Sequence, residues 1–386
     1  MLSLRRLITK LTAPWSARPI CQKTAAEYLT SRFGHYCPPK QVVHTPYIRD
    51  ELLPNNICGT KPSWKFTSLR SREIPEASVL QLSDGRCWGT NGTILSADRI
   101  LLSDVSREFG QKEHRMFRRR FIPQPSHYDS NIAVAATAGA SLYYHWMFDV
   151  LPRLWLLEKA GVTPHLDKII LPRLTHAYEA ETLQKMGIDP DTYLISEHSN
   201  FHVSAAHLFV PSLPSPLGTV SPWVCDFLRD LYGVDKNRVH ARTATRKLYV
   251  TRRLAQRRRV INEDELLHHL EELGFEVVEC ELLTVAQQAK LFAEARIVVA
   301  PHGGGLSNLV FCPPGVTVVE LFPSSFVVPC FWILANAVNL NYWYMIDQQE
   351  KGQFAPFWTS KSEDFHVSLK TLLPFIENQL TCKNAC

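Results

Sequence analysis

Short apolar runs alternate with amphipathic stretches in the second half of the chain. Leucines at helical spacing follow Asn262 and stop at Gly274, and a second amphipathic stretch runs over 284–295. Asn262 and Glu265 are expected to form a capping box at the start of the first helix. This order predicts a doubly wound, Rossmann-like unit. Its expected strands are KLYVTR (247–252), FEVVEC (275–280), IVVA (297–300) and VTVVEL (316–321).

The first half of the chain is less regular. From about 76 to 125 the pattern is short and strand-like, with turn signals at Asp84-Gly85 and Asn91-Gly92. An α/β layer is expected to follow, because buried-strand runs and amphipathic helices alternate there. Its expected elements are strands at 131–137, 168–172 and 207–211 and helices at 141–159 and near 176–186.

These patterns divide the 386 residues into two α/β units. We expect a leader and irregular cover over residues 1–75, because periodicity is weak there. An N-terminal α/β domain is expected over 76–235 and a C-terminal Rossmann-like domain over 236–348. The tail, 349–386, contains a helical stretch that is expected to pack back across the first unit.

Composition narrows the class of protein only a little. The net charge is +5, and Lys and Arg cluster at 112–120 and 246–259. Such clusters attract nucleic acid, acidic lipid or a phosphorylated small molecule, but these lack the interleaved aromatics of a single-strand binder. The ten cysteines show no zinc-type spacing, and reduced thiols are expected, with disulfides left open near both ends. No apolar run approaches the ~20 residues that span a bilayer.

The stretch APHGGGLSN (300–308) follows a predicted buried strand. It holds His302 and three glycines, Gly303 to Gly305, with a helix expected next. At the carboxyl ends of parallel strands, glycines let backbone N–H groups approach an anion. A dinucleotide fingerprint is disfavoured, because Asn308 replaces the third small residue and the stretch follows about the fourth strand. A plain glycine turn remains the alternative to a site for a phosphorylated ligand.

Two further candidates carry chemistry. Arg252 ends the strand KLYVTR on the edge where His302 is expected, and a guanidinium group can bind phosphate oxygens bidentately. A solvated basic loop is the alternative. In the aromatic-rich stretch 141–161, His145, Asp149 and Arg153 share one helical face, so His145 and Asp149 can form a hydrogen-bonded pair. A surface ladder of charges would show the same spacing.

Four motifs occur in an order and spacing that resemble glycosyltransferase family 61. The resemblance covers about residues 130 to 345. It departs from the family at Gly304, where alanine is frequent, and this change is expected to be tolerated. The motifs are YYHWMFDVLPRLWLLE (143–158), KLYVTRR (247–253), RRVINEDEL (258–266) and APHGGGLSNLVFCPPGVTVVEL (300–321).

The resemblance implies a GT-B-like α/β fold, in which an acceptor-side domain and a nucleotide-sugar-binding domain, both Rossmann-like, face a central cleft. It implies inverting transfer of xylose, arabinose or N-acetylglucosamine from a nucleotide-diphosphate donor, expected to be UDP-linked, to a glycan, polysaccharide or lipid-linked saccharide. A bacterial-type enzyme of capsule or lipopolysaccharide biosynthesis is expected, cytoplasmic and in peripheral contact with the inner membrane. The rival classes are a non-catalytic protein and a nucleic-acid-binding protein.

Inversion needs a base for the acceptor proton and positive groups for the departing diphosphate. Asp149 is the preferred base, with His145 as its partner or as the base itself. Nucleic acid is not an expected partner, and no metal is expected to be required, because arginine and helix-end amides can neutralise a diphosphate. The expected donor-binding groups are Arg252, His302 and the backbone amides of Gly303, Gly304 and Gly305. Asn308 is expected either to cap the helix or to contact a phosphate. Glu320 is expected to accept hydrogen bonds from the ribose hydroxyls.

Overall fold

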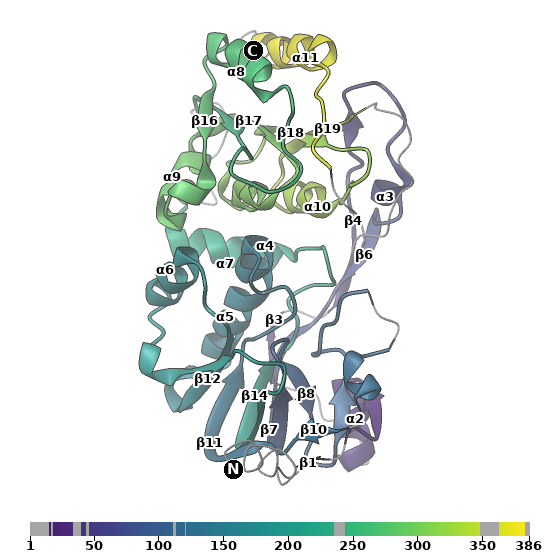
Figure 1. The fold of residues 1–386 in the computed structure, drawn as a ribbon, viewed down its shortest axis with the longest axis vertical. Helices are drawn as coiled ribbons and strands as arrows, with labels where there is room; N and C mark the ends of the chain where they lie inside the picture. Colours follow the sequence, from purple (N-terminus) through teal and green to yellow (C-terminus); the bar gives the residue numbers. More distant parts are fainter. Residues whose placement is uncertain are drawn as a thin grey trace, which may run out of the picture. The chain divides into compact units, whose positions relative to one another are not determined.

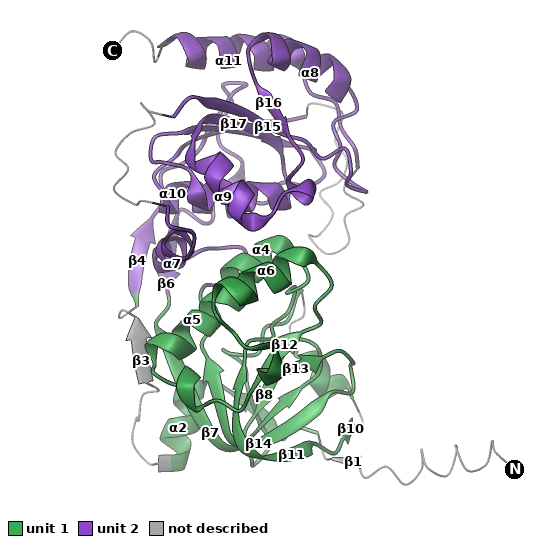
Figure 2. Ribbon diagram, turned by 90° about the vertical axis from the view of Figure 1, so that its left-hand side faces the viewer, with its two compact units in different colours: residues 1–46, 75–214 green, residues 47–74, 215–386 purple. Residues whose placement is uncertain are grey.

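The computed structural model describes residues 15–16, 18–33, 40–43, 46–110, 113–119, 121–234, 244–347 and 363–382. Contacts between residues divide the chain into two compact units (Figure 2). Unit 1 comprises residues 1–46 and 75–214, and unit 2 comprises 47–74 and 215–386. The division differs from the predicted one. The expected leader, 1–75, is shared between the units, with residues 47–74 in unit 2 and the rest in unit 1, and residues 215–235, expected in the first domain, belong to unit 2.

Unit 2 is built on a six-stranded, all-parallel sheet in the order β16-β15-β17-β18-β19-β5. This is the doubly wound arrangement that the apolar runs predicted, with β19 and β5 added at one edge. The strands are β5 (Asn55–Asn56), β15 (Arg246–Val250), β16 (Glu276–Val278), β17 (Ala295–Pro301), β18 (Thr317–Phe322) and β19 (Asn341–Ile346). A separate antiparallel pair joins β4 (Tyr47–Asp50) to β6 (Ser71–Ile74).

Helices cover both faces of the unit 2 sheet. In Figures 1 and 2, α8 and α11 lie on one face and α9 and α10 on the other. The leucines of α8 and residues Leu372 and Ile376 of α11 pack on Tyr249, Val299 and Val319 of the sheet. The helices are α3 (Trp64–Thr67), α7 (Pro222–Tyr232), α8 (Glu263–Glu272), α9 (Val285–Ala293), α10 (Cys330–Ala337) and α11 (Leu369–Cys382), with 3-10 turns η5 (Cys280–Leu282) and η6 (Gly304–Phe311).

Two local predictions for unit 2 are corrected. The tail helix α11 packs in unit 2 itself rather than across the first unit. Asn262 precedes α8 but makes no capping bond; its side-chain amide exchanges two hydrogen bonds with the backbone of Val367, each 2.9 Å. The same amide cannot serve both purposes, and the long-range bonds attach the chain before α11 to the start of α8. The capping box in this unit is that of Thr284 and Gln287, at α9.

Unit 1 contains a nine-stranded mixed sheet, of which only part is Rossmann-like. The strands β13, β12, β11 and β14 run parallel, and β14 then pairs antiparallel with β7, which continues into β8 and β9. The strands are β2 (Cys21–Lys23), β3 (Lys40–Val43), β7 (Ala77–Trp88), β8 (Thr93–Leu95), β9 (Ile100–Leu102), β11 (Ser126–Val134), β12 (Lys168–Pro172), β13 (Tyr193–Ser196) and β14 (His202–Pro211), with β1 (Trp15–Ser16) and β10 (Ile122–Pro123) as a separate pair.

The helices of unit 1 follow the parallel strands. An α-helix interrupted by one π-helical turn connects β11 to β12, and α6 connects β12 to β13. The elements are α2 (Ala25–Phe33), η1 (Arg115–Arg118), α4 (Tyr143–His145), the π-helical turn η2 (Trp146–Val150), α5 (Leu151–Lys159), η3 (Thr163–His165), α6 (Ala177–Lys185) and η4 (Pro190–Thr192).

One of the two predicted turns in unit 1 is a strand. Asp84 and Gly85 lie inside β7, where Asp84 has a φ of 51° and the register of the pairing with β14 is the same on both sides of it. A Cβ at Gly85 would lie 2.8 Å from Leu82 and 2.9 Å from Leu208, so the glycine is needed inside the strand because there is no space for a side chain. The predicted turn at Asn91-Gly92 is confirmed, because it joins β7 to β8.

Both sheets reverse their strand order at one point. In unit 2, β16 lies on one side of β15, and the next strand of the chain, β17, lies on the other side. In unit 1, β12 and β14 flank β11 in the same way. Ligands of doubly wound proteins bind beyond the carboxyl ends of the strands at such a switch point. The topology therefore predicts that ligand-binding residues follow β15 and β17 in unit 2 and β11 in unit 1.

Arg153 of α5 fixes the helix to the switch point of unit 1. Its side chain is fully buried, and it donates to the carbonyl oxygens of Ala136 (2.7 Å), just after β11, and of Pro211 (3.1 and 3.3 Å), the last residue of β14. Arg153, which the sequence analysis placed on one helical face with His145 and Asp149, therefore has a structural role.

Replacing Arg153 by Met should destabilise unit 1, because two buried carbonyl groups would lose a charged donor. A loss of ~3 kcal/mol corresponds to a fall of roughly 6–12 °C in the unfolding midpoint of a unit of this size. Circular dichroism melting curves measure it. Arg173→Ala, at an exposed position, is the control and should melt like the wild type; equal midpoints for all three proteins would contradict the assignment.

Candidate functional site

Two loops of unit 2 meet at the switch point of its sheet. β15 and β17 are paired neighbours, with Tyr249 opposite Val299. Arg252 follows the end of β15 by two residues, and His302 follows the end of β17 by one. The structure thus confirms that these two residues share the carboxyl edge of the sheet, as the sequence predicted.

Glycines let the two loops approach each other closely. A Cβ on Gly303 would lie 1.8 Å from Nη1 of Arg252, so any side chain there would displace the guanidinium group. Gly303 is extended (φ 179°), a conformation open to any residue, so the requirement is for space. A Cβ on Gly305 would lie 2.9 Å from Val250 and 3.3 Å from Sγ of Cys280. The N-terminus of η6, whose first N–H groups have no partner within the helical turn itself, is thereby held beside Arg252.

His302 lies among three phenylalanine rings. Its ring stacks on Phe322 at 5.2 Å between centroids, with Phe331 at 5.2 Å and Phe326 at 5.4 Å. Only 5% of the residue is exposed. Its backbone N–H donates to the carbonyl oxygen of Leu321 at 2.9 Å, which ties the loop to β18. The imidazole therefore has one fixed orientation.

A buried carboxyl group holds the imidazole from behind. Nδ1 of His302 lies 2.5 Å from Oε1 of Glu320, and the hydroxyl of Tyr342 donates to Oε2. Burial lowers the pKa of His302 well below its usual range, and the charges of Arg258 and Arg252 add to this. Burial raises the pKa of Glu320, against the effects of Tyr342 and Arg258. Both neutral forms are favoured, so one proton lies between Nδ1 and Oε1, and Nε2 is the atom of His302 left for a ligand.

Arg258 is a member of this site that the sequence analysis missed. Its guanidinium carbon lies 4.6 Å from the centroid of Phe326, and its backbone has a φ of 60°. Burial and the charge of Arg252 lower the pKa of Arg258 to about 10, and burial also lowers that of Arg252. The run 257–259 was the signal, but the sequence does not say which arginine faces the site. Arg257 is exposed, and Arg259 pairs with Asp364 at 2.7 Å.

Neither of the two inward arginines forms a salt bridge with a carboxylate of the described residues, although Glu281 and Asp364 lie near enough to raise the pKa of Arg252 against the effect of burial. Within the described part of the chain, Nε of Arg252 and Nε of Arg258 are buried without a hydrogen-bond partner. Nη2 of Arg252 donates to the carbonyl oxygen of Arg257 at 3.2 Å. Two desolvated cations beside a neutral imidazole make an environment that an anion would stabilise.

The structure revises two of the predicted donor contacts. Glu320 is completely buried and both of its oxygens are engaged, so it orients His302 instead of meeting a ribose. Asn308 is also completely buried; its amide donates to Oε1 of Gln288 at 2.6 Å and to the carbonyl oxygen of Gly305 at 3.1 Å. Asn308 therefore fixes η6 on α9 from inside and does not face a phosphate.

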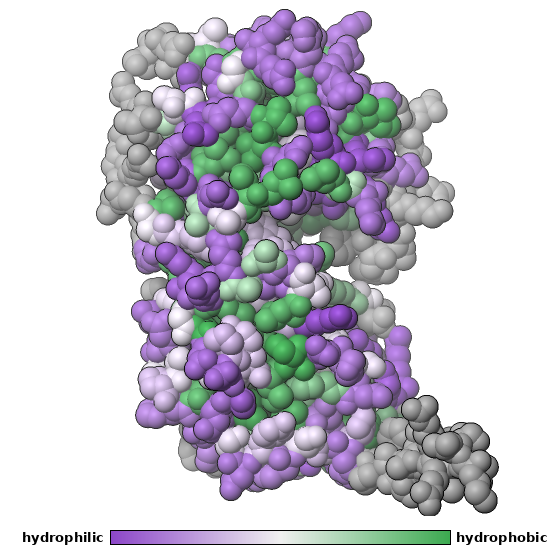
Figure 3. All heavy atoms as spheres, turned by 60° about the vertical axis from the view of Figure 1, so that its left-hand side comes forward, coloured by the Kyte–Doolittle hydropathy of each residue, from purple (hydrophilic) through white to green (hydrophobic). Residues whose placement is uncertain are grey.

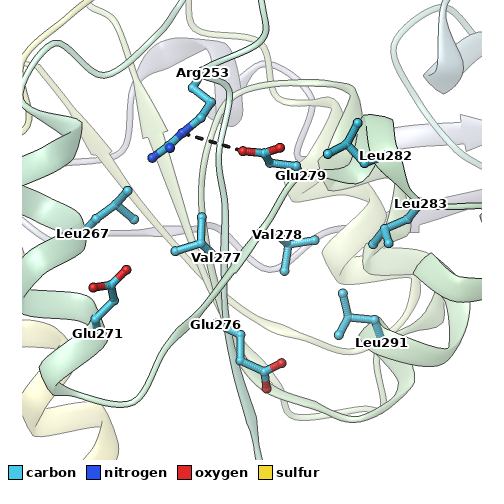
Figure 4. A pocket seen from close by; sticks show the side chains of 10 residues that line it. All are labelled: Arg253, Leu267, Glu271, Glu276, Val277, Val278, Glu279, Leu282, Leu283 and Leu291. Atoms are coloured by element: carbon cyan, nitrogen blue, oxygen red, sulfur yellow. Dashed lines mark ion pairs between the residues drawn. The ribbon is translucent and has the colours of Figure 1, made fainter.

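Arg253 lies beside two glutamates. It lies 3.8 Å from Glu263 and 3.9 Å from Glu279, and it lines a hollow of about 530 Å³ beside the edge strand β16 (Figure 4). Three glutamates line this hollow, at 271, 276 and 279. The charge of these glutamates is unfavourable for binding a diphosphate.

Figure 3 shows apolar residues gathered on the face of unit 2 that is turned toward the viewer. The exposed apolar side chains of this unit include Leu254, Ile261, Val277 and Leu282.

In unit 1 the predicted pair of His145 and Asp149 is confirmed. His145 ends α4, and Asp149 lies in the π-helical turn that follows, a feature frequent at functional sites. Nδ1 of His145 lies 2.6 Å from Oδ2 of Asp149. Nη1 of Arg107 lies 2.6 Å from Oδ1 of the same carboxylate. Arg107 comes from the loop after β9. It precedes Asp149 by 42 residues in the sequence, so no local pattern could have linked the two residues.

The environment fixes the charge of Asp149. Burial alone would raise its pKa, but the charge of Arg107 and the hydrogen bond from His145 outweigh it, so the pKa lies below its usual range. The ring of His145 is held by Phe109 at 5.4 Å and Tyr144 at 5.3 Å. A Cβ on Gly139 would lie 2.7 Å from Cδ2 of the imidazole. An ionised Asp149 thus orients His145, with Nδ1 as the donor and Nε2 as the acceptor.

The described residues contain no group of three or more His, Cys, Asp or Glu side chains suited to a metal ion. Seven cysteines in the same ranges are free thiols, most of them buried. None of the described helices has the length and apolarity needed to cross a membrane.

Residues 143–319 match the family model for glycosyltransferase 61. A beta-1,2-xylosyltransferase, XYXT1, of Oryza sativa subsp. japonica is 39% identical over 79 residues, 20% of this chain and 17% of the relative. An alpha-1,3-arabinosyltransferase, XAT3, of the same plant is 30% identical over 105 residues, 25% of this chain and 18% of the relative. A beta-1,2-xylosyltransferase of Arabidopsis thaliana is 29% identical over 97 residues, 22% and 18% of the two chains.

The matched part of the chain thus spans less than a fifth of each relative. All three relatives come from plants, which gives the expected bacterial origin no support. The family-model match runs from α4 through β18 and includes His145, Asp149, Arg252 and His302. The family model and the relatives together support glycosyltransferase family 61 for this chain.

Proposed function

We propose that the protein is an inverting glycosyltransferase that moves a sugar from a nucleoside-diphosphate donor to a glycan acceptor. The observation that carries the proposal is the desolvated cluster of Arg252, Arg258 and His302 at the switch point of unit 2. The names of the relatives favour xylose or arabinose as the sugar, and N-acetylglucosamine is the third candidate from the family resemblance.

A diphosphate is the ligand that this cluster fits best. Two guanidinium groups can each bind two oxygens, and the first N–H groups of η6 lie beside them. As the bond from the anomeric carbon to the diphosphate breaks, negative charge grows on the leaving oxygen, where these groups stabilise it. The proposal needs no metal for this step, and uridine diphosphate is the expected leaving group.

His145 is the better candidate for the base. The sequence analysis preferred Asp149, but both oxygens of that carboxylate are engaged, and its side chain is only 5% exposed. A carboxylate with a lowered pKa is a weak base, whereas an imidazole that donates through Nδ1 accepts a proton at Nε2. We therefore propose that Nε2 of His145 accepts the proton of the acceptor hydroxyl and that Asp149 orients the imidazole ring.

The remaining expectations belong to this proposal. A GT-B arrangement would let a sugar acceptor bound by unit 1 reach a donor bound by unit 2. The acceptor, whether glycan, polysaccharide or lipid-linked saccharide, stays a prediction, as do capsule or lipopolysaccharide biosynthesis and a cytoplasmic location with peripheral membrane contact.

A nucleic-acid-binding role has less support. In the second basic cluster, Arg246 pairs with Glu276 at 2.7 Å and with Glu294 at 2.9 Å, and Arg259 pairs with Asp364. These pairs leave fewer charges for a phosphate backbone. Filter binding of an oligonucleotide at two salt concentrations separates the functions, since nucleic-acid binding would be tight and steeply salt-dependent.

Gly303→Ala should abolish binding of uridine diphosphate without unfolding the protein, because the added methyl group occupies the place of the Arg252 guanidinium group. Gly304→Ala is the matched control and should bind like the wild type. Isothermal titration calorimetry measures both, and Arg252→Ala should resemble Gly303→Ala. If Gly303→Ala binds with unchanged affinity, the donor site lies elsewhere.

His145→Ala should lower the transfer rate by about 10²- to 10⁴-fold while donor affinity stays the same, because the base is lost and the diphosphate site is intact. Added imidazole should restore part of the rate. Asp149→Asn should also lose transfer, because an amide selects the wrong tautomer of His145, but imidazole should not restore it. His165→Ala, at an exposed position of unit 1, is the control. Full activity in His145→Ala would return the role of base to Asp149.

A further inference from the structure

Part of the segment 47–74, which the sequence placed in an irregular cover, forms a wall beside the donor site. Its short helix α3 is anchored in unit 2 by Phe66, which is completely buried. The ring of Phe66 lies 4.7 Å from that of Tyr344, 5.4 Å from that of Trp332 and 6.4 Å from that of Phe322. Phe322 is the ring on which His302 stacks, so α3 and the donor loop share one aromatic core.

Two hydrogen bonds fix α3 further. The N–H of Ser63 donates to the hydroxyl of Tyr344 at 3.1 Å. The ammonium group of Lys65 donates to the carbonyl oxygen of Val327 at 3.0 Å, in the loop after β18. Burial lowers the pKa of Lys65. The position of α3 against this loop is therefore set by packing and by hydrogen bonds together.

Trp64 stands on the outer side of this fixed helix. The residue is 64% exposed. It borders a hollow of about 270 Å³, whose walls include Lys65, Leu69, Phe326 and Val327. A large aromatic ring held in water on a rigid support gains free energy when a flat apolar partner covers it. The hollow thus has one exposed indole face, apolar walls and one ammonium group.

Phe326 connects this hollow to the cationic cluster. The same ring lines the hollow, supports the guanidinium group of Arg258 at 4.6 Å and contacts His302 at 5.4 Å. A group bound in the hollow is therefore separated from the diphosphate site by about the width of one ring. A ribose can bridge such a separation between a base and its phosphates.

We propose that this hollow binds the nucleobase of the donor, with Trp64 as its stacking platform. The inference rests on the proposed function, because it assumes that a diphosphate occupies the Arg252 and Arg258 site. A nucleobase suits the walls better than a sugar, because a sugar carries several hydroxyl groups that need partners. The polar groups here are few: Lys65, Ser68, whose hydroxyl donates to the carbonyl oxygen of Lys65, and Ser325. The ammonium group of Lys65 can donate to a carbonyl oxygen of a pyrimidine.

Calorimetric titrations of the full chain with uridine diphosphate, guanosine diphosphate and inorganic pyrophosphate test the inference. In the wild type, one of the nucleotides should bind more tightly than pyrophosphate. Trp64→Ala should weaken that nucleotide about tenfold or more, because stacking on the base is lost, and should leave pyrophosphate within about twofold. Trp64→Phe should retain most of the affinity. Leu52→Ala, at an 83% exposed position of the same segment, is the control and should bind like the wild type.

The outcomes separate this inference from the proposed function. If the wild type binds pyrophosphate but neither nucleotide more tightly, or if Trp64→Ala binds the nucleotide normally, the base site is wrong and the diphosphate site stands. Equal weakening of nucleotide and pyrophosphate in Trp64→Ala would also overturn the stacking role, since it would show an effect through the fold. If the wild type binds none of the three, the proposed donor site fails, and this inference fails with it.

Discussion

The donor site proposed in unit 2 depends on two arginines that are largely removed from water and form no salt bridge within the described part of the chain. Arg252 and Arg258 are brought together at the end of β15, and burial lowers the pKa of both. Such an arrangement costs free energy in the absence of an anion. Its supports are specific: no side chain at 303, a phenylalanine ring under Arg258 and a left-handed backbone at the same residue. Strain and desolvation of this kind concentrate at functional sites.

The two histidine–carboxyl pairs of the molecule show how a counter-charge decides protonation. Both have a contact of 2.5–2.6 Å through Nδ1. Asp149 has Arg107 at ion-pair distance, which lowers its pKa despite burial. Glu320 has a tyrosine hydroxyl, and burial raises its pKa. The first pair is suited to proton transfer through Nε2 of His145, and the second to a neutral imidazole that contacts an anion. Geometry alone would not distinguish them.

Periodicity predicted the elements near the switch point of unit 2, and the strand ends then placed Arg252 and His302 together. What the sequence missed depends on contacts between distant residues. Arg107 reaches Asp149 from another loop, and the φ of Arg258 decides which arginine of a run of three turns inward. Glu320 and Asn308 are polar residues near the loop, and burial gives them partners inside the protein. The segment 47–74 shows weak periodicity because its strands and helix are short, and only its packing assigns it to unit 2.

Hydrogen–deuterium exchange of the full chain with and without uridine diphosphate tests the central claim most directly. Bound diphosphate should slow exchange of the backbone amides at 252–258 and 302–306, since these groups surround the cationic cluster, and Arg252→Ala should remove the effect. Protection confined to other segments, such as the hollow beside β16, or protection that persists unchanged in Arg252→Ala, would contradict the claim that this cluster is the donor's diphosphate site.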